Sequence, residues 1–589
     1  MLFNKLEPIL PTVQKPARYI GGELGSIIKD ADSVDVRFAL CFPDLYEIGM
    51  SHLGSKILYG LINSREDIWC ERTFAPGADM ETEMRARNIP LYALESLEPL
   101  SAFDILGFTL QYELCYTTVL NMLDLAGIPI RASERASFAP LIIAGGPCVC
   151  NPEPVADFFD LFVLGEGEEV TLELIDLYKT AKLNGWDKSQ FLLEAAKIQG
   201  IYIPSLYEVE YRTDGKVNTI TPTPGAPTKV KKRIVKDLDG VFFPESFVVP
   251  YVDIVHDRSM LEVMRGCIRG CRFCQAGYIY RPQREKSPEI LNLNAKALTA
   301  ATGYEEISLT SLSTSDYKGL PELIENLLEW TDGCGVNLSL PSLRIDNFPP
   351  ELIEKLMSVR KSGLTFAPEA GTQRLRDAIN KNITEEDVLT TCRAAFERGY
   401  TSVKLYFMLG LPTETKEDVE GIAELAQKVV DLFYSLPNRP KGKGVNVSIS
   451  AACFVPKPFT PFEFEPQDTP ELFREKQMLL KQSIRSKKIS YRYHDDTTSA
   501  LEAMLARGDR RLSRVIEGAW RRGAKLDSWD EWFDFERWTT AIAEAGLNLD
   551  FYATRRREYD EVMPWSHLDY GITRDYLVQE NKRAHEHNI

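Results

Sequence analysis

The sequence lacks long apolar segments and an export signal. None of the apolar runs in its 589 residues approaches the roughly 18 residues that cross a bilayer, which excludes a helical membrane protein. The first residues, MLFNKLEPILPTVQKPARY, contain no basic stretch followed by an apolar one, so they predict no secretory signal. We therefore expect a cytoplasmic protein that has no contact with a membrane.

The cysteines do not form the framework of a disulfide-bonded protein. There are eleven, an odd number spread over a long chain, which indicates reduced thiols that are free to bind metal. Internal repeats and low-complexity tracts are also lacking, so a solenoid is not expected. The net charge of -17 argues against a surface that is basic overall, although it allows a local basic patch.

The chain divides into three predicted domains. Between residues 34 and 175 short apolar runs alternate with amphipathic stretches of helical length, which predicts an α/β domain with a parallel sheet. The pattern dissolves into Thr, Pro, Gly and Lys at about 205–250, as in a connecting segment. Six strand candidates separated by helical stretches then predict a (βα)6 partial barrel, at 259–266, 305–312, 336–343, 363–370, 402–410 and 445–454. We predict an α/β fold with domains 1–230, 231–469 and a helical domain at 470–589.

Three cysteines follow the first strand of the predicted barrel. The stretch MRGCIRGCRFCQAG places Cys267, Cys271 and Cys274 in Cys-x3-Cys-x2-Cys spacing, of which about 0.004 occurrences are expected by chance in this composition. Chemistry gathers at the carboxyl ends of strands in such barrels, where these thiols fall. Soft thiolates select zinc or an iron-sulfur cluster. A structural zinc site needs four protein ligands, and His256 is the candidate for the fourth. An electron-transfer cluster uses four cysteines, so three leave one iron open.

The cysteine motif, with Phe273 in its aromatic position, resembles the signature of the radical S-adenosylmethionine (SAM) superfamily. The resemblance implies a 4Fe-4S cluster on Cys267, Cys271 and Cys274, whose open iron binds SAM. Reductive cleavage of SAM would then yield methionine and a 5'-deoxyadenosyl radical. It also implies an electron donor such as flavodoxin or ferredoxin. Further residues resemble SAM contacts of the family: Phe273, Ser311, Ser313, Glu369 and Gly410. For Glu369, a carboxylate that offsets a helix dipole is the alternative.

The N-terminal region resembles the flavodoxin-like, cobalamin-binding fold. The matching positions follow predicted strands: Asp44, Tyr46, Gly49, Thr109, Gln111, Gly145 and Gly146. Tyr46 replaces the histidine that binds cobalt in that family, so the resemblance implies cobalamin without a protein histidine ligand. Alternatively, glycine is required at these positions by backbone angle or close packing, and the domain covers the barrel without binding cobalamin. The cysteines of the N-terminal region are expected to be buried and to behave as small apolar residues.

A basic segment lies within the acidic chain. From Arg474 to Lys525 there are fourteen Lys or Arg and six Asp or Glu, interleaved with aromatic residues. This pattern suggests an RNA contact through 474–525, and a solvated helix face is the alternative.

The whole sequence resembles bacterial radical SAM proteins with a cobalamin-type N-terminal domain, a family without an established function. We expect radical methylation of an unactivated carbon. Two alternatives stay open: a cobalamin-independent rearrangement or sulfur insertion, and an iron-sulfur sensor or binding protein.

Overall fold

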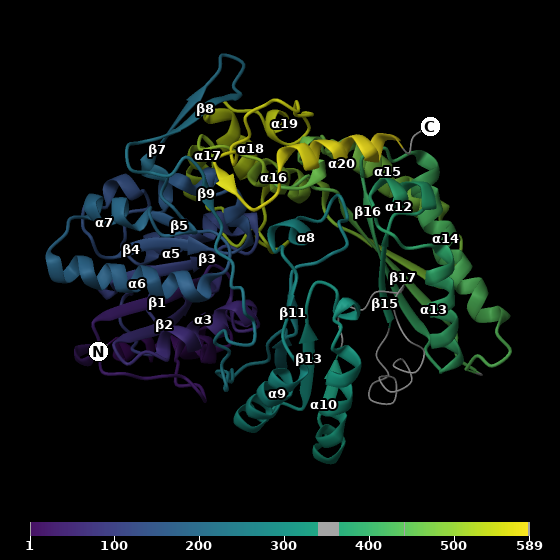
Figure 1. The fold of residues 1–589 in the computed structure, drawn as a ribbon, viewed down its shortest axis with the longest axis horizontal. Helices are drawn as coiled ribbons and strands as arrows, with labels where there is room; N and C mark the ends of the chain where they lie inside the picture. The colour runs from purple at the N-terminus through teal and green to yellow at the C-terminus, as the bar shows by residue number, and fades with distance from the viewer. Residues whose placement is uncertain (1, 340–363, 441, 587–589) are drawn as a thin grey trace.

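A computed structural model describes residues 2–339, 364–440 and 442–586, and Figure 1 shows their arrangement. The first domain is built on a six-stranded sheet in the order β2-β1-β3-β4-β5-β6, in which the first five strands are parallel and β6 is antiparallel to β5. The strands are β1 (Val36–Phe42), β2 (Ile68–Phe74), β3 (Ile105–Thr109), β4 (Leu141–Gly145), β5 (Leu161–Val163) and β6 (Ile201–Tyr202). All seven residues of β1 are buried, as expected for a parallel sheet that is covered on both faces.

Helices follow the strands of the first sheet, as the alternating pattern predicted. They are α3 (Leu53–Asn63), α4 (Ala78–Ala86), α5 (Tyr116–Leu125), α6 (Gly167–Asn184) and α7 (Lys188–Ala195). The connecting segment forms a hairpin of β7 (Tyr207–Tyr211) and β8 (Val217–Pro222). It continues into β9 (Val230–Lys231), which pairs with β19 (Leu568–Asp569) and so joins distant parts of the chain.

The second domain contains strands at the six predicted places and one more, in two parallel groups. The first group is β10 (Ser259–Glu262), β13 (Glu306–Thr310) and β14 (Asn337–Ser339). The second is β15 (Leu364–Glu369), β16 (Ser402–Leu409), β17 (Asn446–Cys453) and the additional β18 (Ile489–Tyr493). Part of the predicted third strand lies outside the described residues. The accompanying helices are α9 (Pro288–Thr302), α10 (Leu320–Cys334), α12 (Gln373–Ala378), α13 (Glu385–Glu397), α14 (Lys416–Ser435) and α15 (Pro470–Ser483).

The prediction of a helical tail from residue 470 needs a correction. β18 pairs in parallel with β17 and so adds a strand to the barrel sheet. The helix that leads into it, α15, therefore belongs to the barrel as well. The helices after it are α16 (Asp496–Ala506), α17 (Leu512–Arg521), α18 (Phe535–Glu544), α19 (Leu549–Tyr552) and α20 (Arg574–Glu586). Residues of α16, α17 and α18 share one apolar core with the first domain. Figure 1 shows α20, in yellow, lying between these helices and the green part of the barrel. None of the described helices combines the length and apolar character that a membrane span requires.

Candidate active site

The three motif cysteines lie in a loop between the small strand β11 (Met264–Arg265) and the short helix α8 (Gln275–Ile279). Cys271 is buried, and Cys267 and Cys274 are half-buried. Burial and the neighbouring Cys271 and Cys267 together raise the pKa of the Cys274 thiol to about 11, although a backbone hydrogen bond from Gly277 and the charge of Lys381 lower it. Because the thiols influence one another in this way, the loop gathers them in one place.

Backbone constraints hold the cysteine loop in shape. Gly266 has φ +83°, and a Cβ atom there would lie 2.7 Å from the carbonyl oxygen of Pro282, so only glycine fits. The carbonyl of Gly270 accepts a hydrogen bond of 2.9 Å from Asn380 Nδ2. Arg272 donates to the carbonyl of Ala378 at 2.6 Å and forms a buried ion pair with Glu580 of α20. Thus the loop is fixed by α12 and by the C-terminal helix.

The cysteine loop supplies soft thiolates, which are the ligands of iron-sulfur clusters. Within the described residues no three His, Cys, Asp or Glu side chains converge closely enough to hold one ion. A four-iron cluster binds each thiolate through a different iron, so its ligands need not converge on one point. His256, the alternative zinc ligand, donates its backbone NH to Ser51 Oγ of the first domain at 3.1 Å. Three thiolates from one anchored loop therefore suit an iron-sulfur cluster with an open iron.

Glu369 and Lys381 form an ion pair beside the cysteine loop. Glu369 is the last residue of β15 and has φ +68°, a conformation that costs about 1–3 kcal/mol for a residue other than glycine. Lys381 Nζ lies 3.1 Å from Glu369 Oε1 and 5.9 Å from the centre of the Phe273 ring. The Glu369 carboxylate therefore lies beside the cysteine loop through Lys381, and its role as a SAM contact stays a prediction. Nothing in the sequence pattern had pointed to Lys381.

The remaining predicted SAM residues have structural contacts in the described chain. Ser311 Oγ lies 2.9 Å from Thr314 Oγ1. The buried Ser313 donates at 2.7 Å to Asp316, which pairs with Arg269 of the cysteine loop. These serines therefore tie the second barrel strand to the cluster loop.

Gly410 ends β16 and packs tightly against α15. It has φ +81°, and a Cβ atom would lie 2.5 Å from Phe473 and 2.8 Å from Asp468. Its backbone NH donates to Glu414 at 2.8 Å, and burial raises the pKa of Glu414 to about 7. Glycine is required here by backbone angle and by packing.

Four of the predicted cobalamin positions meet at the carboxyl edge of the first sheet. Thr109 and Gln111 share a hydrogen bond, and Gly145 and Gly146 follow on the neighbouring strand. Gly146 has φ +107°, and a Cβ atom would lie 2.6 Å from the Leu110 carbonyl oxygen and 3.0 Å from Gln111 Nε2. Thr109 is buried at this edge, and Gln111, Gly145 and Gly146 are half-buried.

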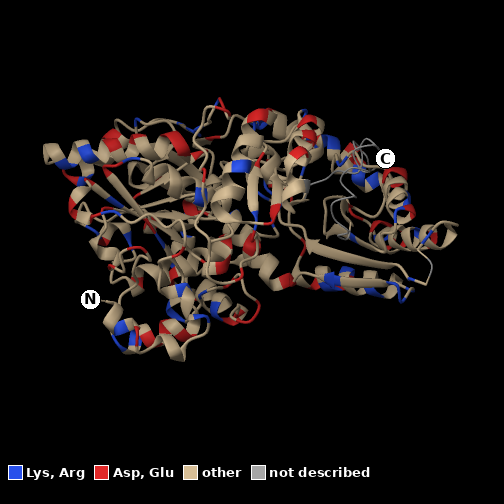
Figure 2. Ribbon diagram, turned by 90° about the horizontal axis from the view of Figure 1, so that it is seen from below, with Lys and Arg blue, Asp and Glu red and all other residues tan. Residues whose placement is uncertain are grey.

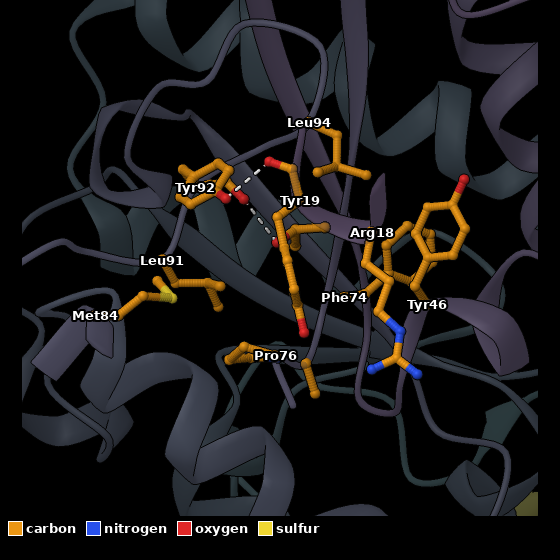
Figure 3. A pocket seen from close by; sticks show the side chains of 11 residues that line it. Arg18, Tyr19, Tyr46, Phe74, Pro76, Met84, Leu91, Tyr92 and Leu94 are labelled. Carbon is orange, nitrogen blue, oxygen red and sulfur yellow. Dashed lines mark hydrogen bonds between the residues drawn. The ribbon is translucent and has the colours of Figure 1, made fainter. Parts of the chain in front are cut away.

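The predicted residues of the first loop, which follows the carboxyl end of β1, are engaged in contacts within the protein. Tyr46 is buried and donates to Glu23 at 2.8 Å, inside the domain. Figure 3 shows Tyr46 at a small cavity of about 20 Å³, room for about one water molecule, so a cofactor does not fit there. Asp44 accepts a hydrogen bond of 2.8 Å from Trp529 of the C-terminal region. A Cβ atom on Gly49 would lie 2.3 Å from Phe74, so this glycine is required by packing.

A histidine that the motif comparison missed lies at the edge instead. His52 caps α3: its Nδ1 accepts from the Ser55 backbone NH at 3.1 Å and lies 2.9 Å from Ser55 Oγ. Burial lowers its pKa to about 4, while the neighbouring Gln111 raises it. The neutral ring therefore carries its proton on Nε2 and acts there as a donor, so this tautomer cannot bind cobalt through Nε2.

Comparisons with known proteins agree with this geometry. Residues 261–426 match the radical SAM superfamily, and residues 54–204 match the N-terminal domain of radical SAM proteins. An uncharacterised protein, MJ0966 of Methanocaldococcus jannaschii, is 30% identical over 482 residues, which cover 81% of this chain and 90% of that protein. The chain belongs to the radical SAM superfamily.

Two further similarities concern methyltransferases. The uncharacterised methyltransferase PH0819 of Pyrococcus horikoshii is 24% identical to this radical SAM protein over 307 residues, 50% of this chain and 59% of that one. The fold is similar to that of TsrM, a radical SAM methyltransferase of Kitasatospora setae, with a TM-score of 0.51 and 13% identity over 87% of this chain and 99% of the other. The similarity to TsrM concerns the fold alone. Membership of the radical SAM superfamily is what implies a 4Fe-4S cluster and SAM.

Proposed function

We propose that this radical SAM enzyme methylates an unactivated carbon and holds cobalamin at the carboxyl edge of its first sheet. The observation that carries the proposal is a contact between the two cofactor regions. Gln275, which follows Cys274 directly, donates from Nε2 to Cys150 Sγ at 3.0 Å and to the Pro458 carbonyl at 3.2 Å. Cys150 ends the turn that follows Gly146. The side chain of Gln275 therefore connects the cluster loop to the edge of the first sheet.

A buried charge network fixes this junction. Lys457, in the loop after β17, forms ion pairs with Glu113 at 2.7 Å and Glu502 at 2.8 Å. Tyr112 donates to Glu502 at 2.8 Å. These residues come from all three parts of the chain, and breaking such a buried pair typically costs about 3–5 kcal/mol. The network holds the two cofactor regions at a constant separation.

The chain's residues have distinct tasks in this proposal. When bound, the cluster and SAM supply the radical and cobalamin supplies the methyl carrier. Cys267, Cys271 and Cys274 hold the cluster, and Glu369 with Lys381 positions SAM. Thr109, Gln111 and Gly146 form the surface toward cobalamin, and His52 donates from Nε2 toward the same surface. We expect cobalamin without a protein nitrogen ligand, because the cap fixes the His52 tautomer.

The experiment uses the full chain, reconstituted anaerobically with iron and sulfide, with and without hydroxocobalamin. We expect 4Fe-4S absorption, dithionite-dependent SAM cleavage, and a bound cob(II)alamin whose electron paramagnetic resonance spectrum lacks splitting from a nitrogen ligand. Cys271→Ala should lose cluster and cleavage, whereas Cys334→Ala, at an exposed cysteine, should keep both.

Product analysis then identifies the reaction. RNA and metabolites from deletion and wild-type cells, grown with methyl-labelled methionine, should differ by one labelled methyl group. SAM cleavage without corrinoid binding would favour the cobalamin-independent reaction, and a cluster that cleaves almost no SAM would favour a sensor.

A further inference from the structure

Three separate segments of this acidic chain contain no Asp or Glu. Residues 398–413, 432–462 and 476–494 together hold twelve Lys or Arg and no carboxylate side chain. Two further stretches share this property, 215–236 with six Lys or Arg and 263–284 with five, whereas Figure 2 shows both charges over most of the ribbon. Such a local excess of positive charge in a chain of net charge -17 is a footprint for an anionic partner.

The fold brings these segments side by side. They contain β16, β17 and β18, which are neighbours in one parallel sheet. At the amino ends of β17 and β18, the Val447 NH donates to the Lys488 carbonyl at 2.9 Å. The side chains of Lys488 and Tyr434 lie next to Gly444: Lys488 Nζ is 3.2 Å, and Tyr434 OH 3.5 Å, from the position that a Cβ atom would take there. The described residues 442–444 and the basic loop 485–488 therefore form one edge.

One face of this sheet is buried and the other is exposed. Val403, Leu405, Val447 and Ile449 point into the core beneath α13, α14 and α15. The alternate residues form two exposed or half-exposed rows, Lys404 with Ser448 and Ser490, and Tyr406 with Ser450 and Arg492. Tyr406 is 38% exposed, and Lys404 Nζ lies 4.5 Å from the centre of its ring. We name Lys404, Tyr406, Lys443, Lys487, Lys488 and Arg492 the acid-free face.

The cations of this face are available to a ligand. All five are exposed, and none forms an ion pair with a carboxylate among the described residues. The rest of the predicted 474–525 region is different: Arg510 pairs with Glu153, Lys525 pairs with Glu81, and Arg507 is fully buried. The basic region 474–525 therefore has two parts. The cations of one part form ion pairs that join domains, and those of the other part lie on the sheet without a carboxylate partner among the described residues.

We propose that the acid-free face binds single-stranded RNA and that this enzyme acts on RNA. Exposed cations spread over a sheet and its loops suit a chain of phosphates, and the exposed rings of Tyr406 and Tyr434 offer stacking surfaces for bases. The assignment of RNA as the substrate rests on the proposed function, whereas binding itself does not.

The face is connected to the radical site along β16. Met408 lies on the same face, four residues beyond Lys404, or about 13 Å at 3.3 Å per residue. It packs against the same apolar cluster as Phe273 of the cysteine loop. A strand of RNA held at Lys404 and Tyr406 could therefore extend its next nucleotides toward the cluster.

The test measures fluorescence anisotropy of a labelled 20-nucleotide oligouridine with the reconstituted full chain at 50–200 mM salt. Lys487→Ala with Lys488→Ala should weaken binding at least tenfold and reduce the slope of log affinity against log salt by about 1.4, since each phosphate contact contributes about 0.7. Tyr406→Ala should weaken binding at least fivefold with an unchanged slope, and Tyr406→Phe should restore it.

A matched pair of charge changes controls for non-specific attraction. Lys229→Ala with Lys236→Ala, on the exposed linker, should leave affinity and slope unchanged. Equal weakening by both pairs, absence of binding at 50 mM salt, tighter binding of duplex RNA, or competition by free phosphate alone would overturn the proposal. SAM cleavage without RNA should be normal in every variant, so failure of the radical chemistry and failure of RNA binding are separate results.

Discussion

At the residue scale, Glu369 stands out because its backbone is strained while its carboxylate is paired. The left-handed conformation at the end of β15 turns this side chain toward Lys381 and the cysteine loop. Strain of this kind persists where the surrounding structure and function require it. The side chain is 17% exposed, so a ligand can still reach it.

Glu369→Gln should weaken SAM binding without loss of the cluster. A hydrogen bond to a charged group contributes about 1.5–3 kcal/mol, so we expect the dissociation constant of SAM to rise about 10- to 100-fold. Equilibrium dialysis with labelled SAM measures this, and the iron and sulfide content should equal that of the wild type. Glu322→Gln, at an exposed position of α10, is the control. An unchanged SAM affinity would remove Glu369 from the ligand site.

Asp527 makes the stability of the protein depend on pH. It accepts a hydrogen bond of 2.6 Å from Thr117, and burial raises its pKa from 3.8 to about 6. Since the folded state binds the proton more tightly than the unfolded state, the stabilising contribution is complete below about pH 4 and is lost as the pH rises through 6. Two pKa units correspond to about 3 kcal/mol.

Asp527→Asn should therefore melt several degrees above the wild type at pH 8, and the difference should fall to about a third of that at pH 4.5. Thermal unfolding of both proteins across this range measures the difference. Asp530→Asn, at an exposed neighbour, should show no such change. A difference that is the same at both pH values would contradict the assignment.

The sequence predicts the cluster ligands because their spacing is local. Lys381 and His52 could not be found in the same way. Lys381 reaches Phe273 only through the packing of α12 on the loop, and His52 lies three residues beyond the motif that Tyr46 matched. Tyr46 was expected at the cofactor edge, yet its apolar ring packs against Phe74 inside the domain, with ring centres 5.2 Å apart.

At the element scale, the carboxyl end of β16 depends on one glycine. Gly410→Ala should destabilise the protein by about 2–4 kcal/mol, because it adds overpacking against Phe473 to a backbone angle that favours glycine. Thermal unfolding with an assay of iron content checks this. Gly442→Ala is matched in angle, at φ +77°, but a Cβ atom there meets nothing within 4 Å. The free energy of unfolding of Gly442→Ala should fall by about 1 kcal/mol. An equal fall in Gly410→Ala would exclude packing as the cause of its instability.

The barrel strands were predictable and the last one was not. VNVSISAAC and SVKLYFML alternate apolar and polar residues over their first six or seven positions, which gives a clear strand period. ISYRY has five residues next to a basic helix, so its period is short. It forms a strand because the edge of β17 presents backbone groups with which it pairs. That edge exists only in the folded sheet, so residues 489–493 alone do not reveal it.

At the scale of the whole molecule, the C-terminal helix closes on the cluster loop. Arg272 and Glu580 form a buried ion pair at 3.1 Å, and Ala584 joins the apolar cluster beside Phe273. Glu580→Gln leaves Arg272 without its charge partner, so we expect faster loss of the cluster in air, with a half-life reduced severalfold. The decay of absorption near 400 nm measures it. Glu586→Gln, on an exposed turn of the same helix, should behave as wild type, and equal decay of both variants would show that the pair does not protect the cluster.

The pair joins residues 308 positions apart in the chain. A ribosome adds about 5–20 residues each second, so roughly 15–60 s pass between synthesis of the cysteine loop and synthesis of its partner helix. During that interval the three thiols are made but the loop is not yet closed over them. A growing chain that meets oxygen before α20 emerges therefore lacks the Arg272–Glu580 pair that fixes its cysteine loop.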